Sequence, residues 1–324
     1  MAKRPPPQHA RNQRSSSAKA APVDSLPGRN GLIISHYGQT LDIEDDAGEL
    51  HRCTARKKLD SLVCGDKVVW QTTATGEGVV VALQARQTLL VRPDNRGALK
   101  PIAANVDQLL VVTAPQPDSQ ALIDTALIDR YLVAAELSRL QAVIVINKVD
   151  LLDKAQLEQV TQLLEGYRRI AYPVLFTSAK QGHGIEAMMT TLTGHTSVFS
   201  GPSGVGKSSL VKAVLPEREI RIGAVSAASG AGRHTTTLAT LYHLPHGGSL
   251  IDSPGVRNFG LWHADPADLA RGFVEFQRFA PSCRFADCLH LAEPDCAVRE
   301  AVATGVIDAA RYDSFRRIAE SLQN

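Results

Sequence analysis

The sequence predicts an α/β protein whose central domain is a doubly wound, mainly parallel sheet, preceded by a small β-barrel and followed by a helical metal-binding domain. Apolar strands alternate with amphipathic helices between residues 98 and 263. Short alternating runs separated by Gly-rich turns precede them, in residues 31–97. A Cys/His cluster interrupts the helical pattern of residues 264–324. These three observations set the predicted domain boundaries.

The amino-terminal segment, residues 1–30, is predicted to be a disordered basic arm. It carries six Lys and Arg residues against one Asp, a charge of +5, whereas the whole chain carries +2, so the remaining residues sum to −3. Pro, Ser, Ala and Gln dominate the arm, so burial would not offset the entropy lost on ordering it. Such an arm either contacts nucleic acid or is a solvated tail that aids solubility.

Composition also limits the compartment. Hydrophobic residues make up 44% of 324, enough for a buried core in two or three domains. No run approaches the roughly 18 apolar residues of a membrane span, and the amino terminus lacks the apolar block of a signal peptide. Five cysteines, three of them clustered late, suit metal binding in a reducing compartment better than disulfides. We therefore expect a cytoplasmic protein with no membrane contact, and we expect a monomer.

The barrel is predicted from about five short strands in fewer than 70 residues, including Gly31–Ile34, Gln39–Ile43 and Lys67–Trp70. A barrel of this size is typical of the oligonucleotide-binding (OB) type. The run His51–Lys58 would give it a basic loop, which either binds RNA phosphates or is simply solvated.

A phosphate-binding loop follows one of the apolar strands of the central domain. Residues 201–208 read Gly-Pro-Ser-Gly-Val-Gly-Lys-Ser, in which glycines let backbone N–H groups surround a phosphate at the start of a helix. Lys207 would bridge the β- and γ-phosphates and so take part in catalysis, and Ser208 would ligate Mg²⁺. The candidate phosphate-binding residues are Gly201, Pro202, Ser203, Gly204, Val205, Gly206, Lys207, Ser208 and Ser209.

Two further segments predict that the nucleotide is GTP or GDP. The Asp150 carboxylate can accept two hydrogen bonds from guanine, and adenine offers no such pair of donors. The Lys148 stem can lie across the base, and Asn147 ties its segment to the phosphate loop. After another apolar strand, a second segment supplies a backbone N–H for guanine O6. The two segments are Asn147-Lys148-Val149-Asp150 and Ser178-Ala179-Lys180.

The Asp252-Ser253-Pro254-Gly255 segment completes the nucleotide-binding set. Asp252 would hold Mg²⁺ through water, and the Gly255 N–H would sense the γ-phosphate. Many GTPases carry Gln at the next position to orient the attacking water, but this chain has Val256. His234 is the candidate replacement, or else a solvent-facing loop residue. One threonine of the run 235–237 should ligate Mg²⁺.

These segments occur in an unusual order. An ordinary GTPase runs from phosphate loop to switch threonine, Asp-x-x-Gly, Asn-Lys-x-Asp and Ser-Ala-Lys, whereas here the last two come first. Because the set is complete, the sequence predicts a circularly permuted GTPase domain. The order also places the Asp252 segment directly before the C-terminal domain, so we expect movement of this switch to move that domain.

The Cys/His cluster has the spacing Cys-x4-Cys-x-His-x5-Cys. Three thiolates and one imidazole form a closed tetrahedral shell for one structural Zn²⁺, with no position free for a catalytic water. The alternative is that these residues are unrelated. The ligands would be Cys283, Cys288, His290 and Cys296.

Taken together, these motifs resemble those of the RsgA (YjeQ) family, the bacterial small ribosomal subunit biogenesis GTPases. The resemblance rests on the permuted order, on Gly-Arg-His-Thr-Thr-Thr at 232–237, on Asp-Ser-Pro-Gly-Val-Arg at 252–257 and on the Cys/His spacing, and it covers residues 30–320. It implies an OB barrel, a permuted GTPase domain and a zinc domain. The family pattern assigns His234 to catalysis and Thr236 to the Mg²⁺-binding switch.

The same resemblance implies slow GTP hydrolysis stimulated by the 30S subunit, binding of 16S rRNA and a late role in 30S maturation. It also implies that the protein checks the decoding region and helps release assembly factors such as RbfA. Two other classes remain: a GTP-binding switch that recruits a protein partner away from the ribosome, and a zinc-dependent RNA-binding module with a vestigial nucleotide site. An assay of whether GTP hydrolysis depends on 30S subunits distinguishes the ribosomal GTPase from the first class. Measurement of GTP turnover alone distinguishes it from the second.

Overall fold

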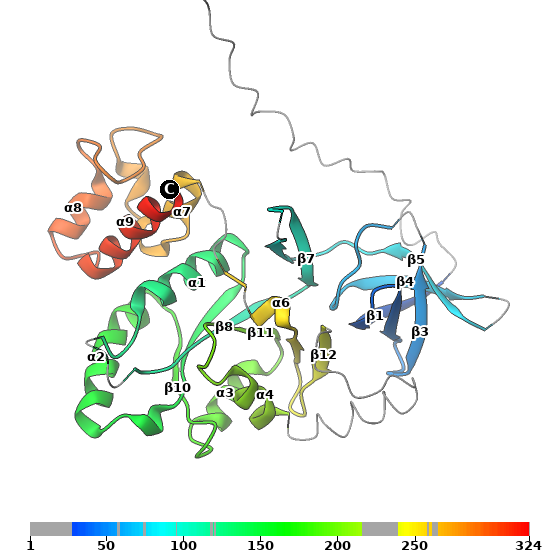
Figure 1. Ribbon diagram of the computed structural model, residues 1–324. Coiled ribbons are helices and arrows are strands. Elements are labelled where there is room, and N and C mark those ends of the chain that lie inside the picture. Colours follow the sequence, from blue (N-terminus) through cyan, green and yellow to red (C-terminus); the bar gives the residue numbers. More distant parts are fainter. Residues whose placement is uncertain are drawn as a thin grey trace, which may run out of the picture.

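The computed structural model shows a barrel and a helical C-terminal domain on opposite sides of a central α/β domain (Figure 1). It describes residues 28–324, except 57–58, 74–75, 95, 117–118, 120, 216–238, 258, 261–264 and 324. The predicted arm therefore lies almost wholly outside the described residues.

Strands precede and then alternate with helices along the chain. The strands are β1 Arg29–His36, β2 Thr40–Glu44, β3 Leu50–Ala55, β4 Lys67–Thr72, β5 Gly78–Leu83, β6 Leu89–Pro93, β7 Leu99–Ala104, β8 Gln108–Thr113, β9 Gln141–Ile146, β10 Val174–Phe176, β11 Thr196–Ser200, β12 Thr240–His243 and β13 Ser249–Asp252. The helices are α1 Thr125–Leu137, α2 Lys154–Arg169, α3 Ile185–Leu192, α4 Lys207–Val214, α6 Pro254–Arg257, α7 Pro266–Arg271, α8 Ala297–Ala303 and α9 Ala309–Gln323.

The first five strands close into a barrel in the order β1-β2-β3-β5-β4, with β4 pairing back to β1. The pairs are antiparallel except β3 with β5, which run parallel. Alternating residues such as Leu41, Ile43 and Val68 fill the interior together with Trp70. The prediction of a small N-terminal barrel is confirmed. The hairpin β6–β7 forms a separate sheet after it.

The central sheet has the order β10-β9-β8-β11-β13, all parallel, with β12 antiparallel at its edge. Along β8, Leu109 and Val111 pack in the core shared with α1 and α2, whereas Leu110 and Val112 pack in the core shared with α3 and α4. Helices thus cover both faces, which confirms the predicted doubly wound sheet.

The barrel and the central domain share one continuous sheet. Strand β12 pairs with β13 on one side and, at Thr240, with Ser35 of β1 on the other. The Ser35 hydroxyl donates to the Thr240 hydroxyl at 3.3 Å, and His243 Nε2 lies 2.6 Å from a carboxylate oxygen of Glu44. The sequence did not predict this junction, because it joins residues 205 positions apart.

The C-terminal domain packs its own aromatic core against α1. Phe273, Phe276 and Phe315 lie within 5.1 to 5.4 Å of one another by ring centroid, and Val133 of α1 belongs to the same buried cluster. The backbone at Gly272 lies so close to Val133 that an added Cβ would come within 2.6 Å of its side chain. The domain therefore has a tight apolar contact with the central domain.

A buried ionic network strengthens this contact. Arg311 of α9 donates to a carboxylate oxygen of Asp129 in α1 at 2.5 Å and, through Nε, to Glu275 at 2.8 Å. The Tyr167 hydroxyl of α2 donates to Asp129 at 2.7 Å, and the Arg311 guanidinium lies 4.6 Å from the Phe273 ring centroid. The three charged side chains are all less than a tenth exposed, so solvent does not screen them.

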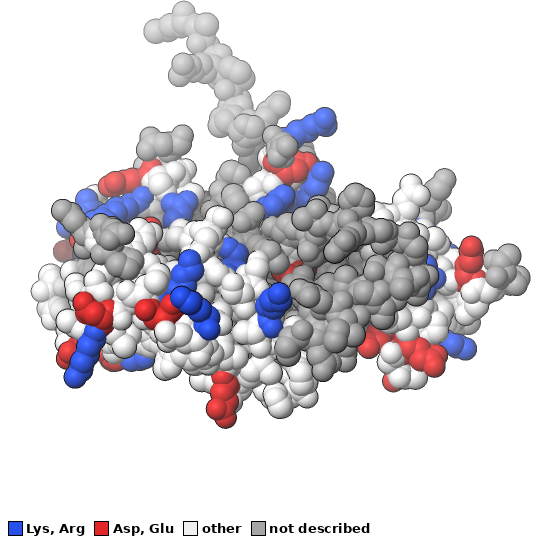
Figure 2. Space-filling view, turned by 60° about the horizontal axis from the view of Figure 1, so that its bottom comes forward, with Lys and Arg blue, Asp and Glu red and all other residues white. Residues whose placement is uncertain are grey.

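On the face shown in Figure 2, the described Lys and Arg side chains lie in several places, with Asp and Glu between them. Among the described residues, none of the helices combines the length and apolar character needed to cross a membrane.

We expect Arg311→Ala to lower the free energy of unfolding by about 3–5 kcal/mol, because it leaves Asp129 and Glu275 buried without their cation. Urea denaturation followed by circular dichroism measures this change. Arg317 lies exposed on the same helix, so Arg317→Ala should change stability by less than about 0.5 kcal/mol. Equal effects of the two substitutions would contradict the structural role of the network.

Candidate nucleotide site and metal centre

The predicted nucleotide-binding segments meet at one edge of the central sheet. Strands β9, β10, β11 and β13 run in the same direction, so their carboxyl ends share an edge. Asn147 follows β9, Ser178 comes shortly after β10, the phosphate loop follows β11, and Asp252 ends β13. The sheet thereby brings together segments that lie in a permuted order in the chain. His234 and Thr236, and the run 235–237 as a whole, fall outside the described residues.

The phosphate loop has the conformation that its glycines permit. Gly201, Gly204 and Gly206 have φ values of +147°, +84° and +95°. A Cβ at Gly201 would overlap the Val112 carbonyl oxygen, and one at Gly206 would overlap the Asn147 amide. Positive φ and these close approaches together require glycine. The loop therefore lies directly against both the β8 backbone and the Asn147 segment.

Lys207 lies at the start of α4 with its ammonium group turned toward the loop. Its Nζ donates to the carbonyl oxygens of Gly201 and Pro202, at 2.6 Å each, and the residue is only 9% exposed. A buried ammonium needs such acceptors, and phosphate oxygens are stronger ones. The arrangement holds a positive charge inside the loop where an anion would bind.

Asn147 joins three segments of the site. Its amide nitrogen donates to the Val205 carbonyl at 2.8 Å, and its amide oxygen accepts from the Thr177 hydroxyl at 3.2 Å and from the Ala179 N–H at 3.3 Å. Asn147 and Thr177 are both buried. Sequence reasoning missed Thr177; its position directly before Ser178 was the available signal.

The polar groups expected to read the base are also held in place. Lys148 has φ +62°, and its Nζ donates to the Gly204 carbonyl at 2.6 Å, so its stem runs from one segment to the other. The Ser178 hydroxyl donates to a carboxylate oxygen of Asp150 at 2.5 Å and accepts from the Gln181 N–H at 3.2 Å. Ser178 is fully buried, so it fixes the direction of the Asp150 carboxylate.

The Asp252 segment turns into α6 immediately after β13. Asp252 is 3% exposed, and the Ser253 hydroxyl accepts from the Val256 N–H at 3.0 Å, which caps the short helix. A Cβ at Gly255 would come 3.3 Å from Ile102 of β7, so the β6–β7 hairpin lies against this segment. Val256 is buried, so its side chain packs in the core and does not face a nucleotide.

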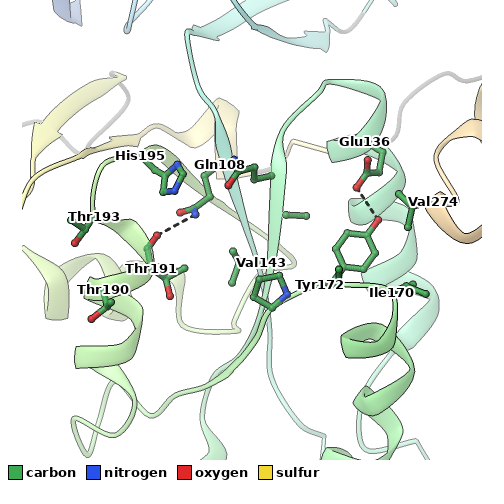
Figure 3. Close-up of a pocket in the computed structure, with 14 residues that line it drawn as sticks. Gln108, Glu136, Val143, Ile170, Tyr172, Thr190, Thr191, Thr193, His195 and Val274 are labelled. Carbon is green, nitrogen blue, oxygen red and sulfur yellow. Dashed lines mark hydrogen bonds between the residues drawn. The ribbon is translucent and has the colours of Figure 1, made fainter.

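A cavity of about 610 Å³ lies at the opposite edge of the sheet, where β8 and β9 begin (Figure 3). Gln108 and His195 line one side of it, and Glu136 and Tyr172 line the other. The polar side chains already have partners: Gln108 donates to the Thr191 carbonyl at 3.2 Å, and the Tyr172 hydroxyl to Glu136 at 2.9 Å. Burial raises the pKa of Glu136, although the Tyr172 hydrogen bond acts in the opposite direction. None of the predicted nucleotide-binding residues lines this cavity, so it is separate from the candidate nucleotide site.

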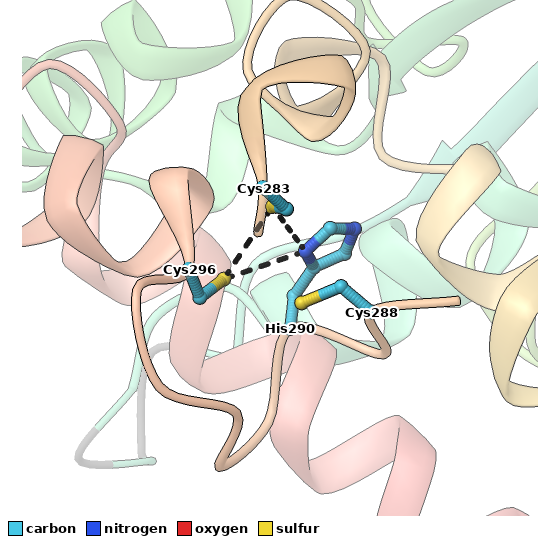
Figure 4. A group of neighbouring side chains, drawn as sticks. All are labelled: Cys283, Cys288, His290 and Cys296. Carbon is cyan, nitrogen blue, oxygen red and sulfur yellow. Dashed lines mark hydrogen bonds between the residues drawn. The ribbon is translucent and has the colours of Figure 1, made fainter. Parts of the chain in front are cut away.

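The four predicted metal ligands converge in the C-terminal domain (Figure 4). His290 Nδ1 lies 3.5 Å from the Cys283 sulfur and 3.4 Å from the Cys296 sulfur, and these two sulfurs are 3.9 Å apart. With Cys288 included, all four ligand atoms lie within 4.8 Å of one another. When four ligand atoms surround one ion in a tetrahedron at about 2.1–2.3 Å, the distances between the ligand atoms are similar to those found here. The four residues therefore fit one Zn²⁺.

The surroundings of the cluster suit ligation. Burial lowers the pKa of His290, which keeps the imidazole neutral and its nitrogen lone pair available. Burial raises the pKa of Cys288 to about 12, so zinc binding at neutral pH must displace its proton. The Tyr312 hydroxyl donates to the His290 carbonyl at 2.7 Å and anchors the ligand loop to α9.

Glu293 organises the ligand loop, and sequence reasoning missed it. Its carboxylate accepts N–H bonds from Leu289 at 3.0 Å, Leu291 at 2.9 Å and Ala292 at 3.0 Å. Burial alone would raise the pKa of Glu293, but these donors lower it overall. Hydrogen bonds from its own backbone to Glu293 thus shape the loop that carries Cys288 and His290, in addition to any metal that these two residues bind.

Comparison with known proteins agrees with this geometry. The RsgA GTPase family profile matches residues 83–262. The chain belongs to the RsgA GTPase family. The small ribosomal subunit biogenesis GTPase RsgA of Chromohalobacter salexigens is 52% identical over 303 residues, which are 92% of this chain and 88% of that protein. The protein of the same name from Pseudomonas syringae is 48% identical over 92% of this chain and 87% of its own.

Two solved structures have the same architecture as this RsgA family member. YjeQ from Thermotoga maritima matches with a TM-score of 0.75 and 35% identity, over 91% of this chain and 99% of that one. YloQ, described as a circularly permuted GTPase, matches with a TM-score of 0.73 and 29% identity, over 94% and 98%. The central domain is a circularly permuted GTPase domain, and the protein hydrolyses GTP.

We expect the purified protein to contain about one Zn²⁺ per chain, because four ligands with no open position form a structural site. Metal analysis by mass spectrometry measures the content. Cys296→Ser should lose most of the zinc, whereas Cys53→Ser, which changes a thiol in the barrel interior, should retain it. An iron–sulfur absorption band, or a wild-type protein without zinc, would refute this assignment.

Proposed function

We propose that this protein is a GTPase that acts in maturation of the small ribosomal subunit. It binds the 30S subunit through 16S rRNA in the cytoplasm, and the subunit stimulates its GTP hydrolysis. It also helps release assembly factors such as RbfA. The observation that carries the proposal is the 52% identity, over most of both chains, to a protein named small ribosomal subunit biogenesis GTPase. The barrel and zinc domain on either side of the GTPase domain provide two surfaces for RNA.

In this proposal, each domain keeps the predicted boundaries and each motif its predicted role. Lys207 contacts the β- and γ-phosphates, Ser208 and Asp252 hold Mg²⁺ together with Thr236, and Asp150 reads guanine. Mg²⁺ would neutralise charge on the transferred phosphoryl group. The support is the position of Lys207 inside the loop and of Asp252 at the neighbouring strand end.

Surface groups on both flanking domains support contact with RNA. The Arg52 guanidinium of the barrel lies 4.7 Å from the Tyr37 ring centroid, and Arg284 of the zinc domain lies 5.5 Å from the ring of Phe285, which is 41% exposed. Such pairs offer a guanidinium and a flat ring for unstacked bases, and a phosphate would compete with Asp42 for Arg52 (2.6 Å) and with Asp295 for Arg284 (2.9 Å). The proposed RNA contact therefore includes both domains.

Guanine selectivity should rest on Asp150. Asp150→Asn removes the acceptor for guanine N1–H and adds a donor that suits the extra carbonyl of xanthine, so GTP affinity should fall and xanthosine triphosphate affinity should rise. Fluorescent-nucleotide titration measures both. Asp153 caps α2 three residues later, and Asp153→Asn, which retains a capping oxygen, should leave both affinities unchanged. Wild-type GTP affinity in the Asp150 variant would contradict the assigned guanine site.

GTP turnover with and without purified 30S subunits tests the function itself. The wild type should hydrolyse GTP slowly alone and faster with 30S, and Lys207→Ala should be nearly inactive in both conditions. We expect His234→Ala to lose roughly 100-fold of the stimulated rate, with little change in GTP affinity, because the residue acts on the attacking water.

The exposed His246 provides a matched control, so His246→Ala should be stimulated normally. If 30S subunits do not accelerate the wild type, the ribosomal proposal fails. If His234→Ala is stimulated as strongly as the wild type, His234 is not the catalytic group, and Arg233 is the next residue to test.

A further inference from the structure

Ser200 lies at a junction between the phosphate loop and the Asp252 segment. It is the last residue of β11, immediately before Gly201, and it is fully buried. Its hydroxyl donates to the main-chain carbonyl of Phe259 at 2.8 Å. Phe259 follows α6 and is itself buried in the core that contains Val256. A side chain next to the phosphate loop thus holds the backbone just beyond the switch.

Helix α1 provides the third side of this junction. The half-buried Tyr131 hydrogen-bonds with the Ser200 side chain. The Tyr131 ring also lies along the main chain after Phe259, because a Cβ at Gly260 would come 3.7 Å from its Cε1. The Ser200 hydroxyl is therefore oriented between an aromatic hydroxyl and a backbone carbonyl, and Ser200 itself is buried.

Strand β11 consequently holds both ends of the segment 252–259. At the start, Ile251 of β13 pairs with Val198 of β11. At the end, Ser200, two residues further along β11, bonds the Phe259 carbonyl. The Phe259 N–H donates to the Val256 carbonyl at 2.9 Å, so the attachment continues into α6. The Asp252 segment can therefore change its conformation only between Ile251 and Phe259. Both of these residues are attached to β11, the strand that precedes the phosphate loop.

We propose that Ser200 is a positioning residue for GTP hydrolysis, which sets the distance between the phosphate loop and the Gly255 N–H by fixing the far end of the Asp252 segment. This inference rests on the proposed roles of Asp252 and Gly255. Ser200 does not touch the nucleotide in this account. It acts through Phe259. Loss of its hydroxyl should therefore weaken the binding of nucleotides that carry a γ-phosphate and leave the binding of GDP, which lacks one, unchanged.

The test compares nucleotide affinities in Ser200→Ala. Loss of the hydroxyl leaves the Phe259 carbonyl buried without this donor, and a buried hydrogen bond of this kind corresponds to roughly a tenfold change in an equilibrium constant. We expect affinity for a non-hydrolysable GTP analogue to fall about tenfold while GDP affinity stays unchanged. The kcat of hydrolysis should fall with it.

Ser197→Ala is the matched control. Ser197 is also fully buried on β11, but its hydroxyl donates to Gln108 at 2.9 Å, at the end of the strand remote from the loop. A merely structural effect would lower the melting temperature of both variants and leave the ratio of the two affinities at the wild-type value. Only the Ser200 variant should change that ratio.

Tyr131→Phe keeps the ring and removes the hydroxyl, so it tests the same junction if Ser200→Ala does not fold. It should change the affinity ratio in the same direction. A wild-type ratio in whichever of these variants folds would overturn the role of Ser200. Failure of the wild type to bind guanine nucleotides would instead overturn the proposed function, so the two outcomes are distinguishable.

Discussion

The hydrogen bond from the Asn147 amide to the Val205 carbonyl is the contact on which the nucleotide site depends. In the chain, the Asn147 segment, which is predicted to read guanine, precedes the phosphate loop by more than fifty residues, and the usual order of the two is reversed. The parallel sheet returns them to the same edge, and the Asn147 side chain fixes them at bonding distance. Gly206 leaves room for that amide, because a side chain at this position would overlap it.

Local patterns predicted most of this fold, because strands, glycine loops and Cys/His spacing are each encoded in short stretches of sequence. Strand β9 and the Asn147 segment after it are one example. Contacts between distant residues were not predictable in this way. Arg311 and Asp129 are 182 positions apart, and each reads in isolation as an ordinary charge on a helix. The partners of Ser200 and Thr177 were hidden for the same reason.

The Arg311 network changes the expected relation between the switch and the zinc domain. Chain order suggested that the domain follows the Asp252 segment, to which it is directly connected. The structure adds an attachment to α1 and α2, through Asp129 and Tyr167. Breaking a buried ionic contact of this kind is costly, so the domain is anchored to the central domain at a place other than the Asp252 segment.

The junction between β1 and β12 also covers the border of the central sheet at Thr240. A strand at the border of a sheet presents unpaired N–H and carbonyl groups, and these recruit other strands. In this fold, β12 would be such a strand, and the barrel lies beside it through Ser35 and Thr240. A chain shortened to its central and zinc domains would leave β12 open along that side. The barrel therefore covers this part of the sheet border, independently of anything that the barrel binds.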